Sequence, residues 1–201
     1  RPDALSSEVE TLCEEASEYG FCAVCVNPCW VSNAKRILED TEVKVCTVVG
    51  FPLGATTAAA KAFETEQAIN DGADEIDMVI NNAFLREGDH HAVIMEIGDV
   101  VAAAQGRCVK VIIETALLSE MEIVMAAQCV ETAGAQYVKT STGFCGKGAT
   151  LSAVKLIRAN ISEGMKIKAS GGIRTREAAL AFVEAGATRL GMSAGVSVVQ
   201  G

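Results

Sequence analysis

The sequence is poor in aromatic residues, in basic charge and in long apolar runs. Aromatic side chains make up 4% of the 201 residues, and the formal net charge is −9. We therefore expect no nonspecific binding to nucleic acid, which needs a concentrated basic face and is helped by aromatic stacking. No run of about 18 apolar residues occurs, and no basic segment followed by an apolar one opens the chain, so neither a membrane span nor a signal peptide is expected. These absences predict a cytoplasmic protein.

Histidine is scarce as well, because the chain has only His90 and His91. Of the eight cysteines, Cys22, Cys25 and Cys29 have a spacing superficially like that of a metal cluster. However, no second cysteine pair or histidine pair lies nearby, and the segment FCAVCVN alternates like a strand. Reduced, mostly buried thiols are therefore a better interpretation than zinc, and we expect no metal.

Apolar residues, by contrast, are abundant at 50%, against 21% charged. One sizeable core can be buried without disulfides or metals, so we expect a single domain over residues 1–201. Short runs rich in Val and Ile alternate with amphipathic segments, which predicts alternating strands and helices. Seven strands are predicted, at Phe21 to Asn27, Val43 to Val49, Asp74 to Ile80, Cys108 to Glu114, Gln136 to Ser141, Lys166 to Ser170 and Thr188 to Ser193.

The predicted helices carry clear start and stop signals. Ser119 and Glu122 have the spacing of a capping box, and Thr175 can cap a later helix. Glycine then ends each helix and opens the turn into the next strand. Three similar short segments share this arrangement: Asp71-Gly72-Ala73, Ala133-Gly134-Ala135 and Ala185-Gly186-Ala187.

Strict alternation implies parallel strands joined by right-handed crossovers, in either a doubly wound sheet or an eight-fold barrel. Four strands carry an ionisable residue in their later part: Asp77, Glu114, Lys139 and Lys168. Period-two alternation places Lys110 on the same face as Glu114. Convergence of such groups at the carboxyl ends of strands favours the barrel, and the glycine-rich turn of a dinucleotide fold is absent after the first strand. The predicted fold class is therefore α/β, a parallel (β/α)8 TIM-type barrel.

Two lysines in apolar strands suggest a chemical role, because a buried ammonium group is costly. For one such lysine alone, snorkelling at a strand end or pairing with a carboxylate is the better explanation. Lys139 and Lys168, however, lie on successive predicted strands. Their mutual repulsion would favour a neutral amine, which is the form that attacks a carbonyl.

At this point the sequence resembles a known family, the deoxyribose-phosphate aldolases. The resemblance covers the chain from its first residues to its last, in order. The segments that carry it are CVNP (25–28), VVGFPLG (48–54), EIDMVIN (75–81), VIIET (111–115), YVKTSTGF (137–144), KASGGIRT (168–175) and RLGMSAG (189–195).

The resemblance implies a class I aldolase, in which Lys139 forms a Schiff base, Lys168 lowers the pKa of that amine and Asp77 shuttles protons. Because the protonated imine is itself the electron sink, the resemblance implies no metal and no cofactor. The alternative for Asp77 is a structural salt bridge to Lys110 or Lys139. We place Lys110 among the other pocket residues.

Substrate contacts are also implied. Gly171 and Gly172, with Ser193 and Gly195, follow the last two strands, where barrels commonly hold a phosphate on backbone N–H groups. A simple left-handed turn is the alternative for the two adjacent glycines. Two further pocket assignments follow from the resemblance: Thr142 contributes a hydroxyl to the sugar, and Cys25 lies near the pocket or is simply a packed strand residue.

The implied reaction is reversible cleavage of 2-deoxy-D-ribose 5-phosphate to D-glyceraldehyde 3-phosphate and acetaldehyde. The expected partners are thus a small phosphorylated sugar and aldehydes, and a homo-oligomer is left open. One departure concerns the first strand, since family members usually begin with an Asp-His-Thr-like segment and this chain starts at Arg1. We therefore expect a barrel that lacks its first strand. The alternatives are another Schiff-base aldolase acting on a different sugar phosphate, and a noncatalytic truncated barrel.

Overall fold

The fold is organised around one sheet of seven parallel strands. The computed structural model describes all 201 residues, and the strands pair in chain order from first to last. They are β1 (Ala23–Val26), β2 (Lys44–Val49), β3 (Glu75–Val79), β4 (Cys108–Ile112), β5 (Tyr137–Lys139), β6 (Lys166–Ser170) and β7 (Arg189–Gly191). Each predicted strand range contains one observed strand, so the alternation in the sequence located the whole sheet correctly.

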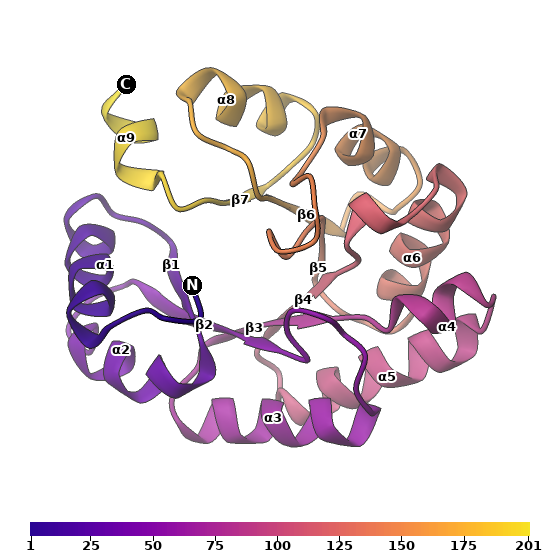
Figure 1. Ribbon diagram of the computed structural model, residues 1–201, viewed down its shortest axis with the longest axis horizontal. Coiled ribbons are helices and arrows are strands. Elements are labelled where there is room, and N and C mark those ends of the chain that lie inside the picture. Colours follow the sequence, from indigo (N-terminus) through magenta and orange to yellow (C-terminus); the bar gives the residue numbers. More distant parts are fainter.

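Helices surround the sheet on its outer side (Figure 1). They are α1 (Ser6–Glu18), α2 (Val31–Ile37), α3 (Ala58–Asn70), α4 (Asn82–Arg86), α5 (His90–Ala103), α6 (Glu120–Thr132), α7 (Leu151–Ala159), α8 (Arg176–Glu184) and α9 (Gly195–Gln200), with short 3₁₀ turns at Pro28–Trp30 and Thr115–Leu117. None of the helices has the length and apolar character needed to cross a membrane.

The helix signals in the sequence work as predicted. Ser119 caps α6, and the Glu122 carboxylate accepts a hydrogen bond from the Ser119 backbone N–H at 2.7 Å, which completes the capping box. Thr175 caps α8 by accepting from the Ala178 N–H at 3.2 Å. The glycines of the three similar short segments all have positive φ, at 104° for Gly72, 82° for Gly134 and 111° for Gly186. Glycine suits these turns because other residues pay a steric cost in the left-handed region.

The barrel is open, as expected for one that lacks a strand. β1 and β7 are the two edges of the sheet and do not pair with each other, and Figure 1 shows the ring of elements interrupted between α1 and α9. Two contacts nevertheless connect the two sides. The Phe21 ring lies against Gly195, leaving little room for a side chain there, and Gln200 Nε2 donates to the Tyr19 hydroxyl at 2.6 Å.

The middle strands are buried on both faces. Every residue of β3 is buried, with Ile76 and Met78 in the apolar core while Glu75 and Asp77 pair with side chains of other strands. A charged side chain in such a position must find a partner, because water does not reach it. The fold therefore forces the ionisable groups of neighbouring strands together inside the open barrel.

Candidate active site

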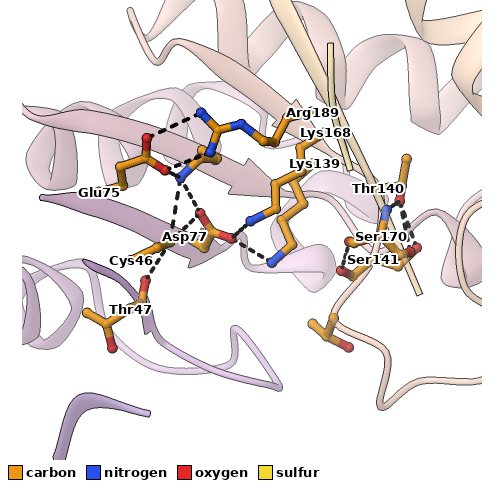
Figure 2. A network of polar contacts seen from close by, with 12 residues as sticks. Cys46, Thr47, Glu75, Asp77, Lys139, Thr140, Ser141, Lys168, Ser170 and Arg189 are labelled. Atoms are coloured by element: carbon orange, nitrogen blue, oxygen red, sulfur yellow. Dashed lines mark hydrogen bonds and ion pairs between the residues drawn. The ribbon is translucent and has the colours of Figure 1, made fainter. Parts of the chain in front are cut away.

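The centre of the candidate site is Asp77, which is fully buried on β3. Its Oδ1 accepts from Lys110 Nζ at 2.8 Å. Its Oδ2 accepts from both Lys139 Nζ and Lys168 Nζ, each at 2.7 Å. Three lysines from three successive strands therefore share one carboxylate. Figure 2 shows Lys139 and Lys168 beside Asp77.

Strand register explains this convergence. Asp77 pairs with Lys110 across β3 and β4, and Lys139 pairs with Lys168 across β5 and β6. Residues that face each other across parallel strands place their side chains on the same face of the sheet. The juxtaposition of Lys139 and Lys168 expected from the sequence is therefore present in the fold.

A second carboxylate extends the cluster deeper into the barrel. Glu75 Oε2 forms ion pairs with Lys110 Nζ at 2.7 Å and with Arg189 Nη1 at 3.3 Å. The connected group thus contains four cationic side chains and two carboxylates. Positive charge is in excess, which favours loss of a proton from one of the lysines.

The ionisation of the cluster follows from competition between burial and pairing. Burial raises the pKa of Asp77, but the three lysines outweigh it and hold that pKa well below its usual range. For Glu75, burial is likewise outweighed by Lys110 and Arg189, and its pKa is lowered. Burial lowers the pKa of Lys168, yet the Asp77 carboxylate reverses the effect and raises it. Asp77 and Lys168 are therefore both charged at neutral pH.

Lys139 is the member of the cluster that reaches an open pocket. The pocket has a volume of about 610 Å³, and α1 forms one of its walls. Lys139, Cys25, Thr142 and Ser193 line it together. Lys139 and Lys168 are each 6% exposed and Lys110 is completely buried, but of the three only Lys139 lines the pocket, so a carbonyl compound bound there meets the Lys139 amine.

Thr142 is held by a carboxylate outside the ionic cluster. Its hydroxyl donates to Glu114 Oε2 in a short hydrogen bond, and its backbone N–H donates to the same oxygen at 3.1 Å. Glu114 is 1% exposed and has a left-handed backbone with φ of 54°. The other oxygen, Oε1, is buried without a hydrogen-bond partner. Glu114 thus orders the loop that follows Lys139.

The proposed phosphate glycines lie at the same end of the barrel but do not line the pocket with Lys139. Gly171 and Gly172 have φ of 86° and 79°, so both adopt the left-handed turn considered from the sequence. Gly171 also packs against the backbone of Gly148. Gly195 begins α9, and of the four residues assigned to phosphate only Ser193 lines the pocket.

A hydroxyl network fixes the carboxyl ends of β5 and β6 (Figure 2). Ser170 Oγ donates to the Ser141 carbonyl at 2.7 Å, and Ser141 Oγ donates to Thr140 Oγ1 at 3.1 Å. Thr140 Oγ1 in turn accepts from the Ser170 N–H at 3.2 Å. These bonds hold the strand ends that carry Lys139 and Lys168, which preorganises the two amines.

The expectation of mostly buried thiols is wrong, because only Cys13, Cys46 and Cys129 are buried. Cys22, Cys25 and Cys29 are exposed, and the group whose ligand atoms lie within 4.8 Å of one another is Cys25, Cys46 and Asp77. Cys46 was not among the candidate residues.

Sequence reasoning also missed Glu75 and Arg189. Glu75 could have been found, because period-two alternation puts it on the same face as Asp77. Arg189 lies at the start of β7 and reaches across the barrel to β3, so only the three-dimensional arrangement reveals the contact.

The parallel barrel and the lysine at its mouth, joined to a buried carboxylate and a second lysine, are the arrangement expected of an enzyme that uses an amine nucleophile. The family model described as "DeoC/LacD family aldolase" matches residues 1–201. The chain therefore belongs to the DeoC/LacD aldolase family, as the sequence resemblance predicted.

Individual relatives agree with this membership. Deoxyribose-phosphate aldolase of Streptococcus equi subsp. zooepidemicus is 56% identical over the whole chain, which spans 91% of that relative. Deoxyribose-phosphate aldolase 1 of Bacillus licheniformis is 55% identical, with the same coverage. The solved structure of deoxyribose phosphate aldolase from Aeropyrum pernix, described as tetrameric, has a TM-score of 0.93 and 34% identity. The match covers 100% of this chain and 85% of that one.

Proposed function

We propose that the chain catalyses the reversible cleavage of 2-deoxy-D-ribose 5-phosphate to D-glyceraldehyde 3-phosphate and acetaldehyde. The observation that carries the proposal is the excess of positive charge around Asp77, combined with the access of Lys139 to the pocket. The names of the full-length relatives supply the substrate.

Lys139 is the nucleophile in this proposal. Its neutral amine attacks the carbonyl carbon, water leaves, and a protonated imine forms. A base takes the proton of the hydroxyl on the third carbon while the imine withdraws electrons from the bond between the second and third carbons of the sugar. This bond breaks, glyceraldehyde 3-phosphate is released, and an enamine remains on Lys139. Proton uptake and hydrolysis of the imine then release acetaldehyde and regenerate the amine.

Lys168 and Asp77 assist this chemistry. Lys168 stays charged beside Lys139, and repulsion between two ammonium groups at one carboxylate favours the neutral form of the amine that faces the pocket. Asp77 Oδ2 touches both amines at 2.7 Å, so it can pass a proton between them and the substrate. Lys110 has a different role. It is completely buried, does not line the pocket, and balances the negative charge of Asp77.

The sugar phosphate is assigned to the region of Ser193, Gly171, Gly172 and Gly195. The backbone N–H groups of these turns supply the donors in the proposal, and Ser193 borders the Lys139 pocket. Thr142 faces the same pocket and is assigned to a sugar hydroxyl, with Glu114 holding it in place. Cys25 borders the pocket, but we assign it no role in the reaction.

Ser193→Glu tests both the reaction and the phosphate assignment. The variant should raise KM for deoxyribose 5-phosphate at least about tenfold, because a carboxylate repels the phosphate dianion, while acetaldehyde self-condensation changes little. Coupled assays of glyceraldehyde 3-phosphate release and of acetaldehyde condensation measure the two effects. An equal loss of both activities would show that Ser193 does not contribute to phosphate binding. Absence of cleavage by the parent chain would reject the substrate itself.

We also propose a cytoplasmic location and a homo-oligomeric assembly. All eight cysteines are free, which suits a reducing compartment. Several large apolar side chains are exposed on the helices, among them Met121 at 78% and Phe63 at 61%, and such surfaces suit contacts between subunits. The Aeropyrum pernix relative is described as a tetramer.

A further inference from the structure

Two cysteines lie next to each other at the edge of the ionic cluster. Cys25 on β1 and Cys46 on β2 are register partners in the parallel sheet. Their sulfur atoms and an oxygen of Asp77 all lie within 4.8 Å of one another. Cys46 also donates to Asp77 Oδ1 at 3.1 Å, and Lys110 Nζ lies 3.5 Å from its sulfur.

The two thiols differ in access and in acidity. Cys25 is exposed and lines the Lys139 pocket, whereas Cys46 is buried behind it. Interaction with the Cys46 thiol, helped by Lys168 and Lys139, lowers the pKa of Cys25 to about 6 despite the opposing effects of burial and Asp77. Interaction with Cys25, burial and Asp77 together raise the pKa of Cys46 well above the usual value. The accessible cysteine is thus a thiolate at neutral pH, and its neighbour keeps its proton.

The surrounding positive charge determines whether a metal cation or an uncharged oxidant can reach the two cysteines. Three lysine side chains already occupy the Asp77 carboxylate, and Lys110 and Lys168 carry positive charge, so a metal cation would meet strong repulsion at this position. An uncharged oxidant meets no such barrier. Adjacent strands are about 4.8 Å apart, which lies within the range of about 4.4–6.8 Å between the Cα atoms of a disulfide. β1 has a neighbour on one side only, so it can shift as the sulfurs approach.

We propose that Cys25 and Cys46 form a dithiol modification site, which hydrogen peroxide converts into a disulfide between β1 and β2. The Cys25 thiolate attacks one peroxide oxygen, the O–O bond breaks, and hydroxide leaves, so that Cys25 becomes a sulfenic acid. Cys46 then gives up its proton, its sulfur attacks the Cys25 sulfur, the S–O bond breaks, and water leaves. Overall, two thiols are oxidised to one disulfide, and one peroxide is reduced to two molecules of water. A dithiol reductant reverses the change.

This site is independent of the substrate proposed above, because it depends only on the two sulfurs and their environment. Oxidation would also remove the S–H donor from Asp77 Oδ1. The test therefore reads the covalent state of the cysteines by mass, and not the aldol reaction.

The experiment exposes the intact protein at pH 7 to a small excess of hydrogen peroxide, followed by alkylation and peptide mapping. A linked peptide pair containing Cys25 and Cys46, with two hydrogen atoms lost, is expected. Both thiols should become resistant to alkylation together and recover together in dithiothreitol. A linked pair that contains Cys22 or Cys29 in place of Cys46 would overturn the proposal.

Two variants complete the test. In Cys46→Ser the Cys25 sulfenic acid has no resolving thiol, so it should gain a second oxygen and become a sulfinic acid that dithiothreitol does not reduce. Cys22→Ser is the matched control, because Cys22 is exposed on the same segment but outside the pocket, and it should form the linked pair as the parent does. If Cys25 of the parent reached the sulfinic acid as fast as it does in Cys46→Ser, Cys46 would not be its partner.

Discussion

Two groups of buried charges can be compared within this molecule. Lys61 on α3 and Glu96 on α5 form one pair, with Nζ and Oε2 2.7 Å apart and exposed fractions of 0% and 2%. The other oxygen of Glu96 accepts from the Asn81 N–H at 2.6 Å. One ammonium group thus meets one carboxylate whose two oxygens both have partners. At the barrel mouth, three lysines meet Asp77.

The pKa values of the two carboxylates, Glu96 and Asp77, are shifted in opposite directions because of this difference in the number of lysines. Burial raises the pKa of Glu96, and the single lysine does not offset the effect. Burial acts on Asp77 in the same direction, but three lysines hold its pKa well below the usual range. A balanced pair between two helices therefore serves packing. An excess of lysine beside a pocket favours a neutral amine, which is the role that we propose for Lys139.

The largest effect should come from Lys139→Leu. Turnover and borohydride-trapped adduct should be lost by about 10³-fold or more, because no other lysine lines the pocket. The free energy of unfolding should change by less than about 1 kcal/mol, since Asp77 keeps Lys110 and Lys168. Kinetics, peptide mapping after trapping with acetaldehyde, and denaturant titration measure these quantities. An adduct on Lys168 in the parent protein would contradict the assignment.

Lys61→Met should show the reverse pattern. Removing one partner of a balanced buried pair leaves Glu96 uncompensated, which costs about 3–5 kcal/mol of stability. The kcat of the folded fraction should remain within about threefold of the parent, since this pair lies outside the pocket. Lys61→Met/Glu96→Gln is the matched control, because it removes both charges and keeps an acceptor for Asn81. Failure of this double variant to recover stability would show that packing, and not charge balance, explains the loss.

Lys168→Leu should reduce trapping by about 10²-fold at pH 7 while leaving the Lys139 amine in place. Without the second ammonium group, repulsion no longer favours the neutral form of the reacting amine, so less of the amine can attack a carbonyl at pH 7. Trapping should therefore recover as the pH approaches 9 or 10. The measurement is the rate of borohydride-trapped adduct as a function of pH, with circular dichroism to confirm folding. A pH profile identical to that of the parent would mean that Lys168 does not activate Lys139.

The smallest effect concerns Glu75→Gln, and its pH dependence tests the inner part of the cluster. The pKa of Glu75 is lowered in the folded state, so its contribution is fully present above the ordinary value of 4.5 and is lost as the pH falls through the folded value. The variant should be about 2 kcal/mol less stable than the parent at pH 7. This difference should shrink below about pH 4.5, because the parent then becomes protonated at the same position. Denaturant titrations of both proteins at several pH values test this, and a constant difference would contradict it.

The sequence predicted the strands and the main charged residues because both depend on local pattern. All seven strands follow from alternation and glycine turns, with boundaries that differ by up to two residues. The convergence of Asp77, Lys139 and Lys168 follows from their late positions in parallel strands. Arg189 could not be predicted in the same way, because its contact with Glu75 spans 114 residues.

The Lys61–Glu96 pair was missed for a different reason. Lys61 lies in a helix that begins with a run of alanines, and a lysine in such a segment is usually exposed. Only the packing of α3 against α5 shows that both charges are buried. Glu114 was recognised as a strand-end carboxylate, but its left-handed backbone and its bonds to Thr142 depend on the loop after β5.

The order of the strands has a consequence for how the chain acquires its fold. Each strand pairs with the strand that follows it in sequence, so most of the sheet needs only short-range closure. The Gln200–Tyr19 hydrogen bond, by contrast, joins residues that are 181 positions apart in the sequence, so it needs long-range closure. We expect the sheet to grow one unit at a time as the chain leaves the ribosome, with this contact joining its two sides after the last helix emerges.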